Sequence, residues 1–443
     1  MIVSEVNDIE NAVEKISVIA KEQGLDFYST YFEIVPSDIL YTFGAYSGMP
    51  SRFNHWSFGK AFQRMKLQYD LNLSRIYELV INTNPSYAFL LEGNSLIQNK
   101  LVIAHVFAHV DFFKNNSYFK KTSKNMIENM SVSAKRIQEM EFKYGIDEVE
   151  KFIDAAMSLQ FNVDSRSDLG KRKGKVNKPT SDYDDLFELD KPEESKTDEE
   201  EKEIIEDSDV IRFIIKHSQY LKDWQKEILS IIREERLYFQ PQIETKIMNE
   251  GWASFWHSRI MRMLDLTPNE ALEFAVMHSS VIQPSKLSLN PYFLGYKIWE
   301  EIEQKYGQEF MFEVREIEND MSFIRNYLSN NLIKELDLFV FEKMGRVWQI
   351  TDKDYDDVRN TLIRNLMNGG LPYINAVEKD FNHNGELLLK HYYDDVNLDY
   401  LYLKKTLEHV YRLWGRNVHL ETVVDNKKVL FSFDGEELFK QGR

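Results

Sequence analysis

The chain has 443 residues, 43% of them hydrophobic and 29% charged, and it contains no cysteine. This length corresponds to about two or three domains, and the absence of cysteine excludes disulfides, thiolate metal ligands and a cysteine nucleophile. The net charge is −17, but residues 181–209 carry fifteen acidic and three basic residues, so the remainder is close to balanced and argues against a general nucleic-acid-binding face.

The N-terminal part predicts one helix and then an irregular aromatic stretch. Apolar residues recur at helical spacing in residues 8–24. Residues 25–60 are aromatic and carry turn signals such as Pro36 and Gly48. The chain begins without the basic and apolar regions of a secretion signal, and no apolar run is long enough to cross a membrane, so we expect a cytoplasmic protein.

The central part predicts mostly helices around one unusual segment. Before that segment the pattern gives a helix at 60–73, a strand at 75–83 and helices at 94–115, 124–144 and 147–159. After it, helical patterns cover residues 208–236, 242–264, 267–280, 291–305 and 308–316. The segment itself begins with the basic run 171–175 and becomes strongly acidic, and its low apolar content predicts a disordered insertion.

The last hundred residues predict a small mixed domain. The elements are a helix at 353–367, strands at 372–379 and 386–392, a helix at 398–414, and strands at 417–424 and 427–433 joined by a turn at Asp425-Asn426. We therefore expect a mainly α protein with a C-terminal α+β domain. Its four parts are a first helical half at 1–162, the insertion at 163–207, a second helical half at 208–345 and the α+β domain at 346–443.

The first candidate for chemistry is a pair of histidines, His105 and His109, in a helical pattern. Residues four apart share one helix face, so the two imidazoles can bind one metal ion. The arrangement resembles the HExxH motif of zincins, except that Val106 stands where zincins carry their general base. A hydrolytic site would therefore take its base from elsewhere. The alternative is two structural histidines with ordinary hydrogen bonds.

The second candidate is a helical pattern that contains Glu250 and His257. These residues are seven apart and share a face, and the EGWA string resembles the helix that supplies the glutamate ligand in gluzincin-like metallopeptidases. Gly251 allows another backbone or a ligand to approach closely. The alternative is a buried glutamate–histidine hydrogen bond.

Together, the two patterns predict a shared site for a divalent metal. The expected ion is zinc, with iron or manganese as alternatives. His105, His109 and Glu250 would be ligands, and His257 would be a fourth ligand or an outer group.

Four further residues are candidates for proton transfer or substrate contact. Glu244 and Asp111 are possible general bases because they lie near the predicted ligands in the sequence. In the aromatic stretch, Glu33 and His55 could line a pocket, although an aromatic mini-core is the alternative for His55. Phosphate loops of the types GxGxxG and GxxxxGK[ST], and the GxSxG nucleophile elbow, are absent from the sequence.

Several long strings resemble the SpoVR (stage V sporulation protein R) family. They are FGAY at 43–46, RFNHWSFGK at 52–60, KLQYD at 66–70, YELVIN at 77–82, GNSLIQNK at 93–100, the His105–Asp111 string, DWQ at 223–225, PQ at 241–242, the stretch 244–257, LNPY at 289–292, IRN at 324–326 and YRLWGR at 411–416. The resemblance covers nearly the whole chain outside the acidic stretch.

The resemblance implies a role in forming the peptidoglycan cortex of spores or in a stress response. It also implies association with a PrkA-type kinase and a YhbH-like protein, and it brings no accepted enzymatic activity. Two functions therefore stay open: a metal-dependent hydrolase that cleaves an amide bond, and a non-catalytic scaffold or regulatory partner of the kinase that uses the acidic stretch as an interaction arm.

Overall fold

The computed structural model describes residues 3–70, 78–164, 206–284, 289–344, 347–394 and 396–442. Its contacts divide the chain into two compact units, Met1–Ile153 with Glu234–Leu371, and Asp154–Arg233 with Pro372–Arg443. By these contacts, residues 346–371 group with the first unit. The predicted insertion at 163–207 lies almost wholly outside the described residues.

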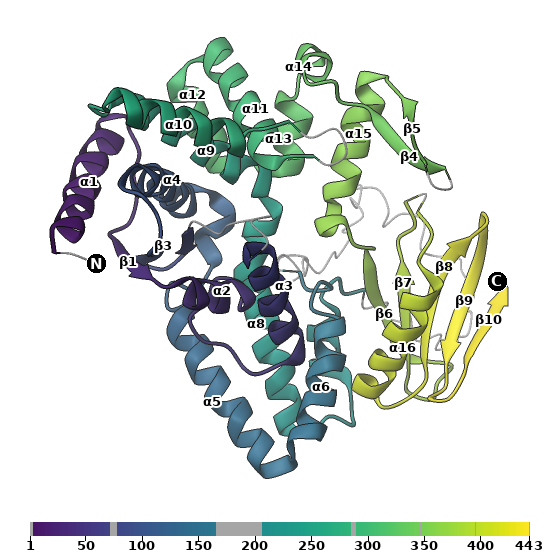
Figure 1. The fold of residues 1–443 in the computed structure, drawn as a ribbon. Helices are drawn as coiled ribbons and strands as arrows, with labels where there is room; N and C mark the ends of the chain where they lie inside the picture. The colour runs from purple at the N-terminus through teal and green to yellow at the C-terminus, as the bar shows by residue number, and fades with distance from the viewer. Residues whose placement is uncertain are drawn as a thin grey trace, which may run out of the picture. The chain divides into compact units, whose positions relative to one another are not determined.

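The first unit is mainly helical, as the sequence predicts (Figure 1). Its elements are α1 (Val3–Glu22), β1 (Thr30–Val35), α2 (Ser37–Ala45), α3 (Trp56–Asp70), β2 (Glu78–Ile81), β3 (Ser86–Leu91), α4 (Leu96–Asn115), η1 (Ser117–Lys121), α5 (Met126–Tyr144), the start of α6 (Ile146–Ser158), the end of α8 (Asp223–Glu244), α9 (Lys246–Met263), α10 (Pro268–Val281), α11 (Pro291–Tyr306), α12 (Gln308–Ile317), α13 (Asp320–Tyr327), α14 (Asn330–Glu335), β4 (Val340–Met344), β5 (Val347–Asp352), α15 (Tyr355–Leu366) and η3 (Met367–Gly370).

A three-stranded sheet lies within the first unit, in the order β1-β3-β2. Strand β1 pairs with β3 in parallel, and β2 pairs with β3 antiparallel. The stretch 25–60, predicted to be irregular, therefore contains a strand and the helix α2. The prediction missed β1 because its hydrogen bonds go to a strand more than fifty residues later, and parallel pairing of this kind leaves no local signal.

Helix α4 lies at the centre of the first unit. Ser95 and Gln98 form a capping box at its start, in which each side chain accepts a hydrogen bond from the other residue's backbone N–H. Every residue from Leu101 to Phe113 is buried. A helix buried on all sides is a core helix, and α4 packs against both α1 and α9 (Figure 1).

Helices α9 and α11 cross at two glycines. A Cβ atom built on Gly251 would lie 2.3 Å from the backbone carbon of Gly295, and one built on Gly295 would lie 2.1 Å from the carbonyl oxygen of Ile247. Backbone contacts of this kind leave no room for any side chain. The close approach expected after Glu250 in the EGWA string is therefore made by the backbone of α11.

The N-terminus of α9 is capped from outside the helix by Asp320, the first residue of α13. Its carboxylate oxygens accept hydrogen bonds from the backbone N–H groups of Ile247 and Met248, at 2.8 and 2.9 Å. Asp320 is almost completely buried. Burial raises the pKa of Asp320 to about 7, against the opposing effect of the two backbone hydrogen bonds.

The second unit is an α+β arrangement. It contains α7 (Val210–His217), the start of α8, β6 (Ile374–Phe381), β7 (Glu386–His391), α16 (Tyr400–Trp414), β8 (Val418–Val424), β9 (Lys427–Phe433) and β10 (Leu438–Gly442), and the sheet has the order β10-β9-β8-β7-β6. The predicted turn at Asp425-Asn426 is confirmed, since both residues have positive φ. The predicted helix at 208–236 is two helices, because α7 ends at His217 and α8 begins at Asp223.

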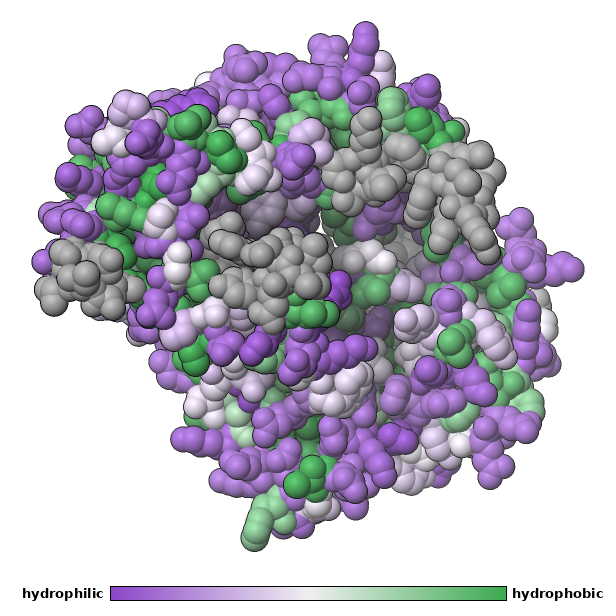
Figure 2. All heavy atoms as spheres, in the orientation of Figure 1, coloured by the Kyte–Doolittle hydropathy of each residue, from purple (hydrophilic) through white to green (hydrophobic). Residues whose placement is uncertain are grey.

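One face of the molecule is mostly polar where the structure describes it. Figure 2 shows hydrophilic residues over most of the coloured part of one face, with apolar residues in small groups between them.

The largest fully buried side chains are Trp252, Trp256 and Trp299. No helix in the described part of the chain is both long enough and apolar enough to cross a membrane.

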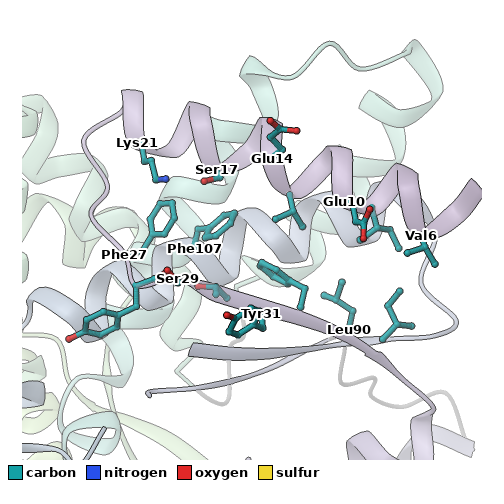
Figure 3. Close-up of a pocket in the computed structure, with 16 residues that line it drawn as sticks. Val6, Glu10, Glu14, Ser17, Lys21, Phe27, Ser29, Tyr31, Leu90 and Phe107 are labelled. Atoms are coloured by element: carbon teal, nitrogen blue, oxygen red, sulfur yellow. Dashed lines mark hydrogen bonds between the residues drawn. The ribbon is translucent and has the colours of Figure 1, made fainter. Parts of the chain in front are cut away.

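A cavity of about 590 Å³ lies between α1 and the three-stranded sheet. In Figure 3, polar residues of α1 (Glu10, Glu14, Ser17 and Lys21) lie along one side of it, and aromatic residues (Phe27, Tyr31 and Phe107) lie opposite. Helix α1 packs into the core through an apolar stripe formed by Ile9, Ala12, Ile16 and Ala20, of which Ile9 also lines the cavity.

The glycine crossing predicts a strong effect of Gly251→Ala. The added methyl group would overlap backbone atoms that cannot rotate away, so we expect the free energy of unfolding to fall by about 2–4 kcal/mol. Urea denaturation measures this change. The matched control is Gly59→Ala in α3, where a Cβ atom meets nothing within 4 Å. The control should be neutral or slightly stabilising, and equal losses in both variants would contradict the close crossing.

Asp320 predicts a pH dependence of stability. Its pKa is about 7 in the folded chain and 3.8 when unperturbed, so between these values the folded state binds more protons than the unfolded state. The free energy of unfolding therefore decreases as pH rises through this window. Relative to Asp320→Asn, which cannot ionise, the native chain should lose about 2 kcal/mol between pH 5 and pH 7. If the free energy of unfolding, measured in urea, changed with pH in the same way for both chains, the raised pKa of Asp320 would be refuted.

Candidate metal centre

The structure brings three of the predicted ligands together. His105 and His109 lie one turn apart on α4, and Glu250 faces them from α9. Their ligand atoms all lie within 4.8 Å of one another. The carboxylate oxygen Oε2 of Glu250 is 3.5 Å from Nε2 of His109 and 3.9 Å from Nε2 of His105.

These distances are close to what a bound metal requires. Two ligand atoms at about 2.1 Å from one tetrahedral ion are about 3.4 Å apart. The carboxylate–imidazole distances of 3.5 and 3.9 Å exceed that value by only a few tenths of an ångström. Small side-chain rotations would therefore close the three donors onto one ion.

Asn249 fixes the proton of His109. Its side-chain oxygen Oδ1 lies 2.9 Å from Nδ1 of His109, and an amide oxygen can only accept a hydrogen bond. The Nδ1 atom of His109 therefore carries the proton, which leaves the lone pair on Nε2, the atom that faces Glu250. A partner that orients a histidine in this way is a regular feature of metal sites.

His105 is held by a series of histidines. Its Nδ1 lies 2.8 Å from Nδ1 of His257, and Nε2 of His257 lies 2.9 Å from Nδ1 of His278 on α10. Both ring nitrogens of His257 are therefore used in hydrogen bonds to other histidines. This geometry favours the outer role for His257 over that of a fourth ligand.

The protonation states of the donors suit a metal. The pKa of His109 is lowered to about 4, chiefly by burial and also by the charge of His105. Burial by itself would raise the pKa of Glu250, but the hydrogen bonds with His105 and Tyr292 and the charges of the two histidines outweigh it, so the pKa is lowered. A neutral imidazole and an ionised carboxylate are the forms that bind metal ions.

The outer histidines are also held neutral. Burial lowers the pKa of His257 well below its usual value, and the charges of His105 and His278 act in the same direction. Burial lowers the pKa of His278 to about 4, with a further contribution from the charge of Arg262. Both outer rings are therefore neutral at neutral pH.

A buried hydroxyl group next to the donors supports the fit of an ion or its water. Ser254 lies one turn after Glu250 on α9 and is fully buried, and its Oγ has no hydrogen-bond partner among the described residues. An unsatisfied buried hydroxyl is costly. The Glu250 side chain is 19% exposed, so the site is not sealed from solvent.

Asp111 lies away from the metal centre, contrary to the role proposed from its sequence position. It follows His109 by two residues and therefore lies on the other side of α4. Its carboxylate is fully buried, binds Arg315 of α12 at 2.7 Å and accepts hydrogen bonds from the indole of Trp252 and the backbone of Asp26. These contacts make Asp111 a structural link between α4, α9 and α12.

The other three candidates occupy separate places. Glu244 is the last residue of α8 and accepts a hydrogen bond from Gln240. Glu33 is exposed on β1 and alternates with Phe32 and Ile34, which pack towards the core around α4, so it points to the opposite face of the sheet.

His55 packs against aromatic rings in a second cavity. Its Nδ1 lies 2.7 Å from the hydroxyl of Ser57, and its ring contacts those of Trp56 and Phe58. This surrounding resembles the aromatic mini-core that the sequence left as an alternative.

Three residues of the site had no role assigned to them from the sequence. They are Asn249, which orients His109; His278, which ends the histidine series; and Tyr292 of α11, whose hydroxyl bonds Glu250 and whose ring stacks near His105. Asn249 has a local signal, because it precedes the glutamate ligand. The other two come from helices that reach the site only through the tertiary fold.

Comparisons with known proteins cover nearly the whole chain. The family model described as SpoVR like protein matches residues 4–371, and the model described as SpoVR-like C-terminal domain matches residues 372–425. A relative from Escherichia coli (strain K12), named "Uncharacterized protein YcgB", is 31% identical over 461 residues, which cover 92% of this chain and 90% of the relative. No solved structure matches the chain.

The placement of Asp111 predicts loss of stability without loss of the metal centre. Asp111→Asn removes the charge that faces Arg315 and leaves a buried cation unpaired, so the free energy of unfolding should fall by about 3 kcal/mol. Chemical denaturation measures the change. The matched control Asp356→Asn breaks a surface pair with Arg359 and should change stability by less than about 0.5 kcal/mol. Loss of a bound metal from folded Asp111→Asn protein would contradict this placement.

Proposed function

This chain belongs to the SpoVR family, and we propose that it is a metal-dependent hydrolase whose centre is formed by His105, His109 and Glu250. The observation that carries the proposal is the convergence of two imidazoles from α4 and a carboxylate from α9 within 4.8 Å. Two histidines and one glutamate are the protein ligands of well-known zinc peptidases.

A bound divalent metal, with zinc as the first choice, supplies Lewis-acid polarisation of a carbonyl oxygen and of a water molecule. The chain's own residues hold and orient the donors. Asn249 keeps the proton of His109 on Nδ1, and His257 anchors Nδ1 of His105. Tyr292 holds the Glu250 carboxylate through its hydroxyl group.

The general base is the part of the mechanism that the three donors do not supply. Val106 occupies the zincin base position, and Asp111 is held by Arg315 on the other side of α4. We assign proton acceptance to Glu244, the last residue of α8, because it is the carboxylate that directly precedes α9 in the chain.

An amide is the substrate class that the donor set favours. Centres that cleave phosphate esters commonly use two metal ions about 3.5–4 Å apart. In the described part of the chain, one group of three donors is present, and it resembles the single-ion centres that polarise an amide carbonyl.

Metal analysis of the purified full-length protein tests the centre. We expect about one zinc, iron or manganese ion per chain, lost in His109→Ala and in Glu250→Ala because each removes a ligand. The metal-loaded protein should hydrolyse members of a panel of N-acylated amino acids and short peptides, and a chelator should abolish this activity.

A histidine outside the first unit provides the control. His383 is 76% exposed, so His383→Ala should keep both metal and activity. Absence of metal after purification without chelators would overturn the centre. Metal that is bound, with every amide substrate left intact, would keep the centre and overturn the hydrolase.

A further inference from the structure

A second cavity in the first unit lies apart from the metal centre. It has a volume of about 570 Å³, within the range of small-ligand sites, and is bounded by α2, α3, α5 and α6. Aromatic side chains form much of its wall: Tyr46, His55, Trp56, Phe58 and Phe62. Trp56 is 57% exposed, so a large aromatic surface at this cavity is open to solvent.

The opposite part of the wall carries two carboxylates. Glu141 comes from α5 and Glu150 from α6, on the two sides of the turn at Gly145. Neither carboxylate forms an ion pair or a hydrogen bond among the described residues. Burial raises the pKa of Glu141, and the negative charge of Glu150 raises it further. In the part of the chain that the structure describes, these two like charges therefore lie near each other without an ion-paired cation.

Aromatic faces and carboxylates together select one class of ligand. The face of an aromatic ring attracts a cation, and a carboxylate pairs with it directly. A hard metal ion takes oxygen ligands around its whole sphere, which a wall of rings cannot offer. An anion would be repelled by both glutamates, and a neutral apolar ligand would leave their charges unpaired.

We propose that this cavity binds a primary alkylammonium group, of the kind carried by a lysine side chain in a peptide or by a free polyamine. The ammonium group pairs with Glu141 and Glu150, and its methylene chain lies along the rings of Trp56 and Phe62. Phe58 contributes less, because the guanidinium of Arg52 already lies 4.4 Å from its ring centroid.

Calorimetric titration of the full-length protein tests the site. The probes are Nα-acetyl-lysine methylamide and its neutral counterpart, Nα-acetyl-norleucine methylamide. We expect the lysine probe to bind about tenfold more tightly or better, since only it offers a charge to the carboxylates and rings. Spermidine in a separate titration distinguishes a free polyamine from a lysine side chain as the preferred source, and tight binding of either supports the site.

Matched charge variants on α6 separate the site from general surface charge. Glu150→Gln should weaken the lysine probe about tenfold, and Trp56→Leu should weaken it severalfold. Glu148→Gln removes the same charge from an exposed position two residues away and should not change binding of the lysine probe.

Three outcomes would overturn the proposal. They are equal binding of the norleucine and lysine probes, equal effects of the Glu148 and Glu150 variants, and no binding of any amine at about 10 mM. All variants should keep their metal, which makes this test independent of the proposed hydrolase.

Discussion

The contact between Gly251 and Gly295 is the constraint on which the candidate metal centre depends. Because the two backbones touch, α11 sets the position of α9 to within the size of one methyl group. Glu250 is the residue before that contact, so its place opposite α4 follows from it. Asp320 holds the start of the same helix through two backbone hydrogen bonds. The carboxylate ligand is thus positioned by backbone geometry, which tolerates far less variation than side-chain packing does.

The two sides of helix α4 make different contacts. One side carries His105 and His109 towards α9, and the other carries Asp111 to Arg315 and the indole of Trp252. The buried ion pair and the candidate centre therefore link the same two helices at different places. This arrangement explains why so short a string contains three buried polar residues: each has a partner on another helix, as burial requires.

The sequence predicted most of the helices, and the structure brings the candidate ligands His105, His109 and Glu250 together, because both depend on spacing within one element. Two histidines four residues apart, and the glutamate before a glycine, carry their geometry locally. Asp111 was placed near the chemistry because it is close to the histidines in the sequence, and only its tertiary contacts with Arg315 and Trp252 place it elsewhere. His55 lines a cavity, as the aromatic stretch suggested, but that cavity is not the candidate metal centre. Strands β1 and β3 were missed because their parallel pairing is non-local, and His278 because it reaches His257 from a separate helix. The break between α7 and α8 lacks a proline or glycine that would have marked it.

Hydrogen bonds along the three imidazoles link metal occupancy of the candidate centre to the tautomer of a distant histidine. A cation bound at Nε2 of His105 would hold the proton of that ring on Nδ1, so Nδ1 of His257 would accept a hydrogen bond and its Nε2 would donate one to His278. Without the cation, the hydrogen bonds between the three rings can be donated in either direction. Occupancy of the candidate centre would thus determine whether Nδ1 of His278, two rings away, carries a proton. Nitrogen-15 chemical shifts distinguish a protonated from an unprotonated Nδ1.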